Sequence, residues 1–405
     1  MRAVTPTLVI GGGIAGAAMA AHLAQAGRAV VLIERRDGPH HKVCGEFVSG
    51  EAALYLDDLA VDLAALGAVR MRTVRLCAGR RVTAVPLPFP AFSVSRRVLD
   101  EALLGAAAEQ GAEICRGRGV RALAPHDGGW LAELDGGDTI AAADVFLATG
   151  KHDLRGWRRP AGAQGDLIAF KTHWRLAPDQ AADLGCAVEL MLFPGGYAGL
   201  EPVEHGLANL CLVVRRLSFA ALGQRWDALL AMLRHASPHL DRRLTGASPC
   251  WSRPLAIASI PYGYVARAGR GPWRLGDQAA VIPSFSGDGI AIALHSARLA
   301  ADVHLAGGTA AQFQEKLARD VAAQVRRATW LSRLLVRPLG QVGAAAAARL
   351  LPDLVVRTAQ ATRIPAPCIR SASDVPTRSG FDDAAALRLA PARCAARPAR
   401  RRDPG

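Results

Sequence analysis

Apolar, small and polar positions alternate near the start of the chain in an order that predicts its first structural unit. Two apolar stretches, residues 7–10 and 29–33, have the composition of buried parallel strands, and the alanine-rich stretch between them predicts a helix. A glycine-rich turn from Gly11 to Gly16 joins the first strand to that helix. The order of strand, turn, helix and strand predicts a βαβ unit.

Further along the chain the pattern of apolar positions becomes typical of a second sheet, and near residue 271 it again resembles that of the first βαβ unit. Residues 69–94 alternate apolar and polar positions around three prolines, which predicts short antiparallel strands and a sheet edge. Ser95 is a suitable N-cap for a helix that runs to Gly111. The other predicted elements are a helix near 51–66, a strand at 112–120, a hairpin at 121–142, a strand at 144–150, strands at 187–193 and 207–214, one helix at 219–235 and helices over 310–360.

The glycine-rich turn has the GxGxxG spacing of a dinucleotide-binding motif. Gly11 allows the tight turn, Gly13 lets the backbone approach a pyrophosphate, and Gly16 permits close packing of the helix on the sheet. The helix N-terminus offers unpaired N–H groups to phosphates. Glu34, eighteen residues after Gly16, can accept hydrogen bonds from a ribose diol. These features together predict an enzyme that uses a nucleotide cofactor.

The same apolar stretch has a second interpretation, a secretory signal peptide. Residues 7–26 are almost wholly apolar, follow Arg2 and end in Ala24-Gln25-Ala26. Under that interpretation the spaced glycines would be accidents, and a glycine-rich turn is poor material for the helical core of a signal sequence. We therefore favour the nucleotide site, and we expect a cytoplasmic protein without a convincing transmembrane span.

Composition changes this picture little. Of the 405 residues 51% are hydrophobic, and the formal net charge of +14 could indicate nucleic acid or an anionic membrane as a partner. Only four basic residues are lysines, and the abundance of Arg, Ala and Gly is typical of a GC-rich coding sequence. From Arg363 onward nine arginines accompany four aspartates, in a tail that we expect to be disordered. We expect no nucleic-acid partner.

Two further features of the composition bear on partners and metals. Four arginines near Trp330 lie in a helical pattern, and such a helix can lie on a membrane surface, although an ordinary packed C-terminal helix explains it too. The eight cysteines form no CxxC pair and no Cys/His cluster of zinc-ligand spacing. We therefore expect no metal site and mostly reduced cysteines. The oligomeric state is left open.

A second motif, from Gly276-Asp277 through Pro283 to Gly287-Asp288-Gly289, narrows the cofactor. It resembles the second flavin motif of FAD enzymes with the para-hydroxybenzoate hydroxylase fold, a superfamily that includes aromatic hydroxylases, flavin halogenases and geranylgeranyl reductases. The resemblance implies that Asp277 hydrogen-bonds the ribityl chain and that the following turn feeds a helix whose N-terminus faces the flavin ring. Oriented N–H dipoles there stabilise the anionic edge of a reduced flavin.

The segment Arg96-Arg-Val-Leu-Asp100 resembles the Arg-x-x-Leu/Phe-Asp segment of the same superfamily, in which the first arginine approaches the cofactor. The resemblance covers about residues 5–305. The FAD-binding residues that the motifs and the resemblance predict are Gly11, Gly13, Ile14, Ala15, Gly16, Glu34, Arg35, Arg96, Val120, Gly276, Asp277, Pro283, Gly287, Gly289 and Ile290.

The expected fold class is α/β, with a discontinuous Rossmann-like FAD/NAD(P)-binding domain, an inserted antiparallel β-sheet substrate domain and a helical C-terminus. The expected parts are an FAD-binding domain over 1–165, within which 70–94 contributes to the substrate domain, the substrate domain over 166–262, a second FAD-binding part over 263–308, C-terminal helices over 309–362 and the basic tail over 363–405.

Two residues are catalytic candidates. Cys44 lies in Lys42-Val-Cys-Gly-Glu46, which is similar to the Cys-Gly loop near the flavin in geranylgeranyl reductases and their bacterial relatives. Its thiol could donate a proton, form a transient disulfide or simply pack. His152 and Asp153 could form an acid/base pair. We slightly favour the alternative, a loop capped by polar side chains. Asp288 could assist at the flavin or cap the following helix.

Departures from the superfamily pattern limit the functional prediction. Many aromatic hydroxylases have Asp-Gly where this chain has Lys151-His152, so NAD(P)H is only a candidate reductant. The halogenase Trp-x-Trp-x-Ile-Pro motif is absent, and the reductases' Tyr-x-Trp-x-Phe-Pro survives only as Phe193-Pro194.

The sequence therefore predicts an FAD-dependent oxidoreductase that acts on a small hydrophobic organic substrate. We favour reduction of a carbon-carbon double bond in a geranylgeranyl reductase-like manner. The close alternative is a monooxygenase that hydroxylates an aromatic or polyketide-type metabolite. An alternative from a different class is a non-catalytic basic protein that binds nucleic acid or membrane.

Overall fold

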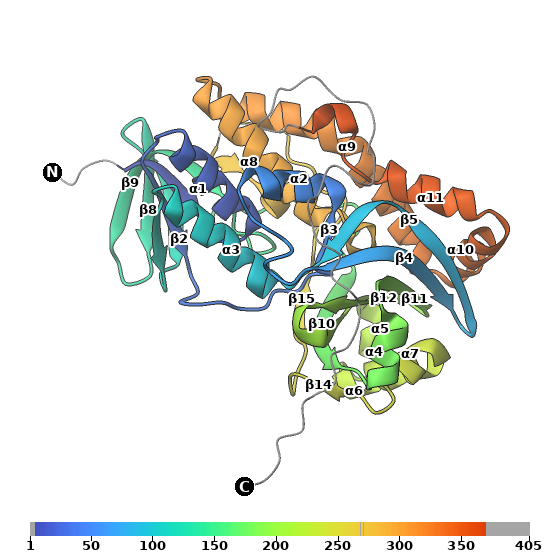
Figure 1. Ribbon diagram of the computed structural model, residues 1–405. Coiled ribbons are helices and arrows are strands. Elements are labelled where there is room, and N and C mark those ends of the chain that lie inside the picture. The colour runs from blue at the N-terminus through green and yellow to red at the C-terminus, as the bar shows by residue number, and fades with distance from the viewer. Residues whose placement is uncertain (1–4, 268, 270, 370–405) are drawn as a thin grey trace, which may run out of the picture. The chain divides into compact units, whose positions relative to one another are not determined.

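The computed structural model describes residues 5–267, 269 and 271–369, and the predicted basic tail lies outside this part from residue 370 onward. The described chain contains a 7-stranded and a 9-stranded β-sheet, with helices packed against them (Figure 1). The predicted α/β fold with a Rossmann-like domain is confirmed, because the first glycine-rich turn connects a parallel strand to a helix.

The 7-stranded sheet carries the glycine-rich turn at the carboxyl end of β1. Strands β1, β2, β6, β9 and β16 are parallel, whereas β7 and β8 form an antiparallel hairpin next to β9. The strand predicted at 112–120 ends early, because Gly117 adopts a left-handed conformation with a φ of 71°. The elements are β1 Thr5–Ile10, α1 Ile14–Gln25, β2 Val30–Glu34, α3 Arg96–Glu109, β6 Glu113–Arg116, β7 Val120–His126, β8 Gly129–Leu134, β9 Thr139–Leu147 and β16 Trp273–Arg274.

The second sheet has nine strands. It runs in the order β14, β10, β13, β12, β11, β4, β5, β3, with β15 paired to β10. Its elements are β3 Phe47–Ser49, α2 Gly50–Asp58, β4 Val69–Ala78, β5 Arg81–Ser93, β10 Leu167–Arg175, α4 Pro178–Leu184, β11 Ala187–Phe193, β12 Gly196–Val203, η1 Glu204–Gly206, β13 Leu207–Arg215, α5 Arg216–Ala221, α6 Trp226–Ala236, α7 Pro238–Leu244, β14 Ser248–Pro249 and β15 Leu255–Ala258.

Three details of this sheet differ from the sequence-based expectations. Strands β4 and β5 are long rather than short, with 10 and 13 residues. The sheet is not purely antiparallel, because β11 pairs with β4 in parallel. The single helix expected at 219–235 is divided into α5 and α6, since Gly223 and Gln224 both adopt left-handed backbone conformations.

The second flavin-type motif and the C-terminal helices complete the fold. Helix α8 packs against α1, and the end of α9 packs on the second sheet, where Leu335 and Val336 join a core cluster with Val213. Helices α10 and α11 lie beside β4 and β5 (Figure 1). These elements are η2 Gly276–Gln278, η3 Ser284–Ser286, α8 Gly289–Leu305, α9 Ala310–Leu335, α10 Pro338–Leu350, α11 Pro352–Ala361 and η4 Ala366–Cys368.

Within the described residues, no single helix has the length and apolar composition needed to cross a membrane. One pair of helical segments, Pro338–Leu350 with Asp353–Cys368, meets the criteria of length and composition together, but it is bent by 116°.

Candidate flavin site and substrate cavity

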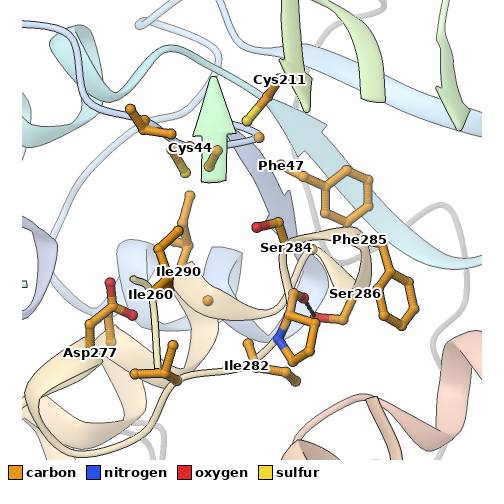
Figure 2. Close-up of a pocket in the computed structure, with 18 of the residues that line it drawn as sticks. Cys44, Phe47, Cys211, Ile260, Asp277, Ile282, Ser284, Phe285, Ser286 and Ile290 are labelled. Carbon is orange, nitrogen blue, oxygen red and sulfur yellow. Dashed lines mark hydrogen bonds between the residues drawn. The ribbon is translucent and has the colours of Figure 1, made fainter. Parts of the chain in front are cut away.

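One large cavity connects the two sheets. Its volume is about 1490 Å³, and side chains from both sheets and from α9, α10 and α11 line it. All the predicted cofactor-binding residues except Gly16 line this cavity, and so do Cys44 and His152. In Figure 2, Asp277, Ile282 and Ile290 lie on one side of the cavity and Cys44 lies across from them.

The three glycines of the first turn have distinct geometric roles. Gly11 has a φ of 108°, and a Cβ atom there would lie 2.5 Å from the carbonyl oxygen of Ala148. A Cβ atom at Gly16 would collide with the carbonyl oxygen of Gly11, so Gly16 serves the packing of α1 on the sheet. Gly13 is different, because a Cβ atom there would lie 3.3 Å from Lys42 Nζ and 3.4 Å from Arg96 Nη2. The space beside Gly13 is bounded by two cations.

Asp100 holds these two cations in place. Its carboxylate lies 2.7 Å from Lys42 Nζ and accepts hydrogen bonds from Arg96 Nε at 2.8 Å and Nη2 at 3.0 Å. Burial alone would raise the pKa of Asp100, but Arg96 and Lys42 hold the pKa below its usual value. Helix α1 begins beside them at Gly13, with no side-chain cap and no acidic residue in its first turn. Free N–H groups and two cations suit a pyrophosphate.

Glu34 ends β2 and is buried. Its Oε2 accepts a hydrogen bond from the N–H of Gly12 at 2.7 Å, and its Oε1 accepts one from the N–H of Arg36 at 2.9 Å. A carboxylate has further lone pairs, so it can still accept from a ribose hydroxyl at the cavity wall. The bonds to Gly12 and Arg36 fix its orientation for that task.

The loop after β9 carries His152 and Asp153, the predicted acid/base candidates, and holds Asp153 in an ion pair with an arginine. Asp153 pairs with Arg159 Nε at 2.6 Å, and Arg159 also donates to the carbonyl oxygen of Asp277. Burial and the nearby cations Arg35 and Lys151 lower the pKa of His152. His152 is therefore an uncharged imidazole at neutral pH, and its carbonyl group helps to hold the loop.

Asp288 shows another departure from expectation. Its side chain does not cap α8; Arg363 Nη1 donates to its Oδ1 at 3.1 Å and Gln324 Nε2 to its Oδ2 at 3.3 Å. Burial raises the pKa of this carboxyl to about 7, against the opposing effect of Arg363. Arg363 is therefore ordered and is not part of a disordered tail, contrary to the sequence-based expectation. It also donates to the carbonyl oxygen of Ser286 and so holds the turn before α8 in place. The N-terminus of α8 is left without a side-chain cap and opens on the cavity through Gly289.

The loop that carries Cys44 is anchored by a buried charged cluster that sequence reasoning missed. Glu46 has a left-handed φ of 66° and a fully buried carboxylate. That carboxylate accepts hydrogen bonds from the ammonium of Lys171 and from the N–H of Arg96 at 2.7 Å, and it lies 2.8 Å from Nε2 of His173. Burial alone would raise the pKa of Glu46, but Lys171 and His173 hold the pKa below its usual value.

The Cys44 sulfur faces hydrogen-bond donors in this arrangement. The N–H of Glu46 donates to Sγ at 3.3 Å, and Arg96 is a neighbouring positive charge. Asn209 Nδ2 donates to the carbonyl oxygens of Cys44 and Gly45 at 3.2 and 2.9 Å. The loop is therefore held from both sides, with its thiol at the cavity wall.

Strand register explains how these distant residues meet. Glu201 of β12 is opposite Asn209 of β13, which is opposite His173 of β10. Cross-strand partners share a face of a sheet, so these polar side chains form one row beneath the Cys44 loop. Lys171 and Cys211 are the cross-strand pair two residues along. The only local signal in the sequence was the presence of polar residues inside otherwise apolar strands.

Glu201 is the most unusual member of the row. It is buried, lines the cavity and has an Oε1 atom without a hydrogen-bond partner among the described residues. Burial and the neighbouring carboxylate of Glu46 raise the pKa of Glu201 well above its usual value. The surroundings of Glu201 therefore favour the protonated form of its carboxyl group.

A metal ion is disfavoured at this cluster. Ligand atoms of His41, Glu46 and His173 lie within 4.8 Å of one another. The Glu46 carboxylate is already bonded to the Lys171 ammonium, however, and that positive charge opposes a metal cation. Burial and the neighbouring His173 and Lys171 lower the pKa of His41 to about 4, in keeping with a site that resists further positive charge.

Comparisons with known proteins agree with this geometry. A family model described as FAD dependent oxidoreductase matches residues 7–85. The menaquinone reductase of Mycolicibacterium smegmatis is 27% identical over 332 residues, which are 76% of this chain and 78% of that protein. The menaquinone reductase of Mycobacterium tuberculosis is 27% identical over 318 residues, which are 73% of this chain and 75% of that protein.

Solved structures of flavin enzymes share the fold. The flavin-dependent brominase Bmp2 superposes with a TM-score of 0.72 at 18% identity, covering 91% of this chain and 96% of its own. The halogenase PltM in complex with phloroglucinol and FAD gives a TM-score of 0.72 at 16% identity, covering 88% and 82%. The glycine-rich turn with its paired cations, the uncapped N-terminus of α8 and these comparisons lead to one conclusion: the chain is an FAD-dependent oxidoreductase.

Proposed function

We propose that this enzyme reduces a carbon-carbon double bond in a long, apolar substrate, in a geranylgeranyl reductase-like manner. The substrate class that we propose is a quinone with an unsaturated isoprenoid chain, of which menaquinone is an example. NAD(P)H is the proposed source of electrons for the flavin.

The cavity is the observation that supports this proposal most directly. Ligand pockets for drug-sized molecules are roughly 300–1,000 Å³, whereas this cavity of about 1490 Å³ extends from the cofactor region to the C-terminal helices. Beyond the cofactor region its walls are mainly apolar. Side chains from the second sheet and the C-terminal helices that line this part are Val74, Leu76, Val85, Leu87, Phe89, Val188, Leu190, Leu212, Val213, Leu331, Leu335, Ala344, Ala347, Leu354 and Val355.

The relatives support the substrate class. Two mycobacterial proteins that align with about three quarters of the chain are both named menaquinone reductase. A quinone with a polyisoprenoid chain has the length and apolar character that the cavity walls match.

Reduction of a double bond requires a hydride at one carbon and a proton at the other. Bound reduced FAD would supply the hydride. We assign the proton to Glu201, which lies at the cavity wall and has Oε1 free of hydrogen bonds within the described residues. Its burial favours the protonated carboxyl. Deprotonated Glu201 would recover a proton from solvent before the next turnover. Cys44 has a different part in this proposal, because its sulfur receives a hydrogen bond from the N–H of Glu46 and so helps to fix the loop beside the cofactor.

Anaerobic single turnover tests the proposal against the monooxygenase alternative. Enzyme reduced chemically under nitrogen is mixed with menaquinone that has an unsaturated side chain, and the products are analysed by mass spectrometry. Once the enzyme has been removed, air reoxidises any quinol to the quinone. We then expect a product that is still heavier by one pair of hydrogen atoms, located in the side chain. A product that forms only after oxygen is admitted, and that is heavier by an oxygen atom, would establish a monooxygenase instead.

A further inference from the structure

We propose that the enzyme docks on an anionic lipid surface through the end of α9 and helices α10 and α11, with the mouth of its cavity against the lipid. Exposed apolar side chains and positive charge mark the docking surface. The role that we give it, entry of a substrate dissolved in the bilayer, rests on the function proposed above.

The docking surface consists of large apolar side chains that face solvent. Soluble proteins seldom expose such side chains in a contiguous group. Six of the nine large exposed apolar residues of the described chain fall within this short segment, and each of the six is 47% to 88% exposed. We call Trp330, Leu339, Val342, Leu350, Leu351 and Leu354 the C-terminal apolar surface.

Helix α10 exposes apolar side chains to solvent and turns a polar side chain inward, the reverse of an ordinary surface helix. Leu339, Val342, Ala346 and Leu350 are all exposed, and their spacing places them on one face of the helix. The polar Gln341 is instead turned inward, where its amide donates to the carbonyl oxygens of Phe193, Gly196 and Leu335. The polar side chain thus serves the interior while the leucines face outward. A helix with this arrangement is stabilised when its outer face meets an apolar medium.

The mouth of the cavity opens at the same surface. Trp330 and Leu354 both line the cavity and are 65% and 47% exposed, so they stand at its rim. Arg326 and Arg327 likewise line the cavity and are exposed. A tryptophan flanked by arginines is typical of side chains at the boundary between lipid headgroups and acyl chains. A long apolar molecule could pass from the acyl region into the cavity without crossing water.

Charge identifies the occupant as anionic lipid. Residues 326–361 contain six arginines and one acidic residue, Asp353. A second copy of the chain, paired symmetrically through this face, would bring like charges together. Anionic headgroups would instead be attracted, and each arginine near such a surface strengthens binding by about fivefold.

Flotation with lipid vesicles tests the proposal in the full-length, FAD-loaded protein, without substrate. We expect the protein to float with phosphatidylglycerol-containing vesicles and to bind phosphatidylcholine vesicles more weakly. Leu339→Glu/Val342→Glu should lower the partition coefficient at least tenfold. Arg333→Gln/Arg337→Gln should lower it only for the anionic vesicles. The matched controls are Leu217→Glu, because Leu217 is a 74% exposed leucine on α5, and Arg175→Gln, at an exposed arginine of β10; neither should change binding.

A second readout reports the orientation. Brominated acyl chains should quench part of the tryptophan fluorescence, and Trp330→Phe should remove that quenching. The basic tail is present in every variant, so equal flotation of Leu339→Glu/Val342→Glu and wild type would overturn the proposal. A wild-type dimer that binds no vesicles and dissociates in the same variant would also overturn it. Vesicle binding without double-bond reduction would contradict only the proposed function.

Discussion

Replacement of Lys171 by methionine tests whether the buried charged cluster holds the cofactor loop. Lys171 and Glu46 are both fully buried, and the Lys171 ammonium donates to the Glu46 carboxylate. Methionine keeps the length of the side chain but removes the charge. The Glu46 carboxylate would retain the N–H of Arg96 and the imidazole of His173, but it would lose its nearest full positive charge.

The expected cost follows from the burial of the pair. Removal of one partner from a buried ion pair destabilises a protein by about 3–5 kcal/mol, because the remaining charge is left uncompensated. Total stabilities are about 5–15 kcal/mol, so Lys171→Met should lower the free energy of unfolding by roughly a third. The exposed pair of Arg234 and Asp241 provides a control. Arg234→Met there should cost about 0–1 kcal/mol.

Urea unfolding of the FAD-loaded variants, followed by circular dichroism, measures these free energies. FAD affinity is the second readout. The Glu46 carboxylate also accepts the N–H of Arg96, and Arg96 bounds the space beside Gly13, so Lys171→Met should weaken FAD binding whereas Arg234→Met should not.

The double variant Glu46→Gln/Lys171→Met completes the cycle. It removes both charges together, so it should cost less than the sum of the two single changes, with a coupling energy of about 3 kcal/mol. Equal costs for Lys171→Met and Arg234→Met, or additive effects in the cycle, would refute the reasoning.

Three other predictions follow from single positions. Gly13→Val should fold normally but lose FAD, because the valine side chain fills the space beside the two cations. Gly16→Ala should instead destabilise the fold, because the added Cβ atom collides with Gly11. Melting curves and flavin absorbance distinguish the two effects, and retention of flavin by Gly13→Val would contradict the prediction for Gly13. Glu201→Gln should slow double-bond reduction by about 100-fold or more, while the flavin content and the chemical reduction of the flavin stay normal. A variant that turns over at the wild-type rate would show that Glu201 is not the proton donor. Because the pKa of Asp288 is raised from 3.8 to about 7, the folded state binds its proton more tightly than the unfolded state, so this group lowers the free energy of unfolding as pH rises from about 4 to 7. Asp288→Asn should remove a decrease on the order of 4 kcal/mol across that window, and parallel stability curves for variant and wild type would show that Asp288 is not responsible.

Local sequence signals determined the first βαβ unit and its glycine-rich turn. The tight turn at Gly11 and the close packing at Gly16 depend on the absence of a Cβ atom, and that requirement can be read from residue type and spacing alone. The pattern Arg96 to Asp100 is similarly local, because residues four apart on a helix are neighbours and form the observed ion pair. The sequence did not predict the division between α5 and α6, because glutamine is not a residue type that indicates the left-handed backbone found at Gln224.

Only the tertiary structure decided what surrounds the Cys44 loop and what the C-terminal helices expose. Glu46, Lys171 and Glu201 come from three distant segments, and strand register sets their proximity. Register depends on pairing across a whole sheet, so no local pattern reveals it. In the same way, the alanine-rich sequence of α10 reads as an ordinary buried helix, and only its packing shows that Gln341 points inward while Leu339 faces out. The sequence by itself determined a nucleotide-binding turn, because that turn is a property of consecutive residues. The surroundings of the buried Glu201 and the exposed apolar surface depend on residues that meet only when the chain is folded.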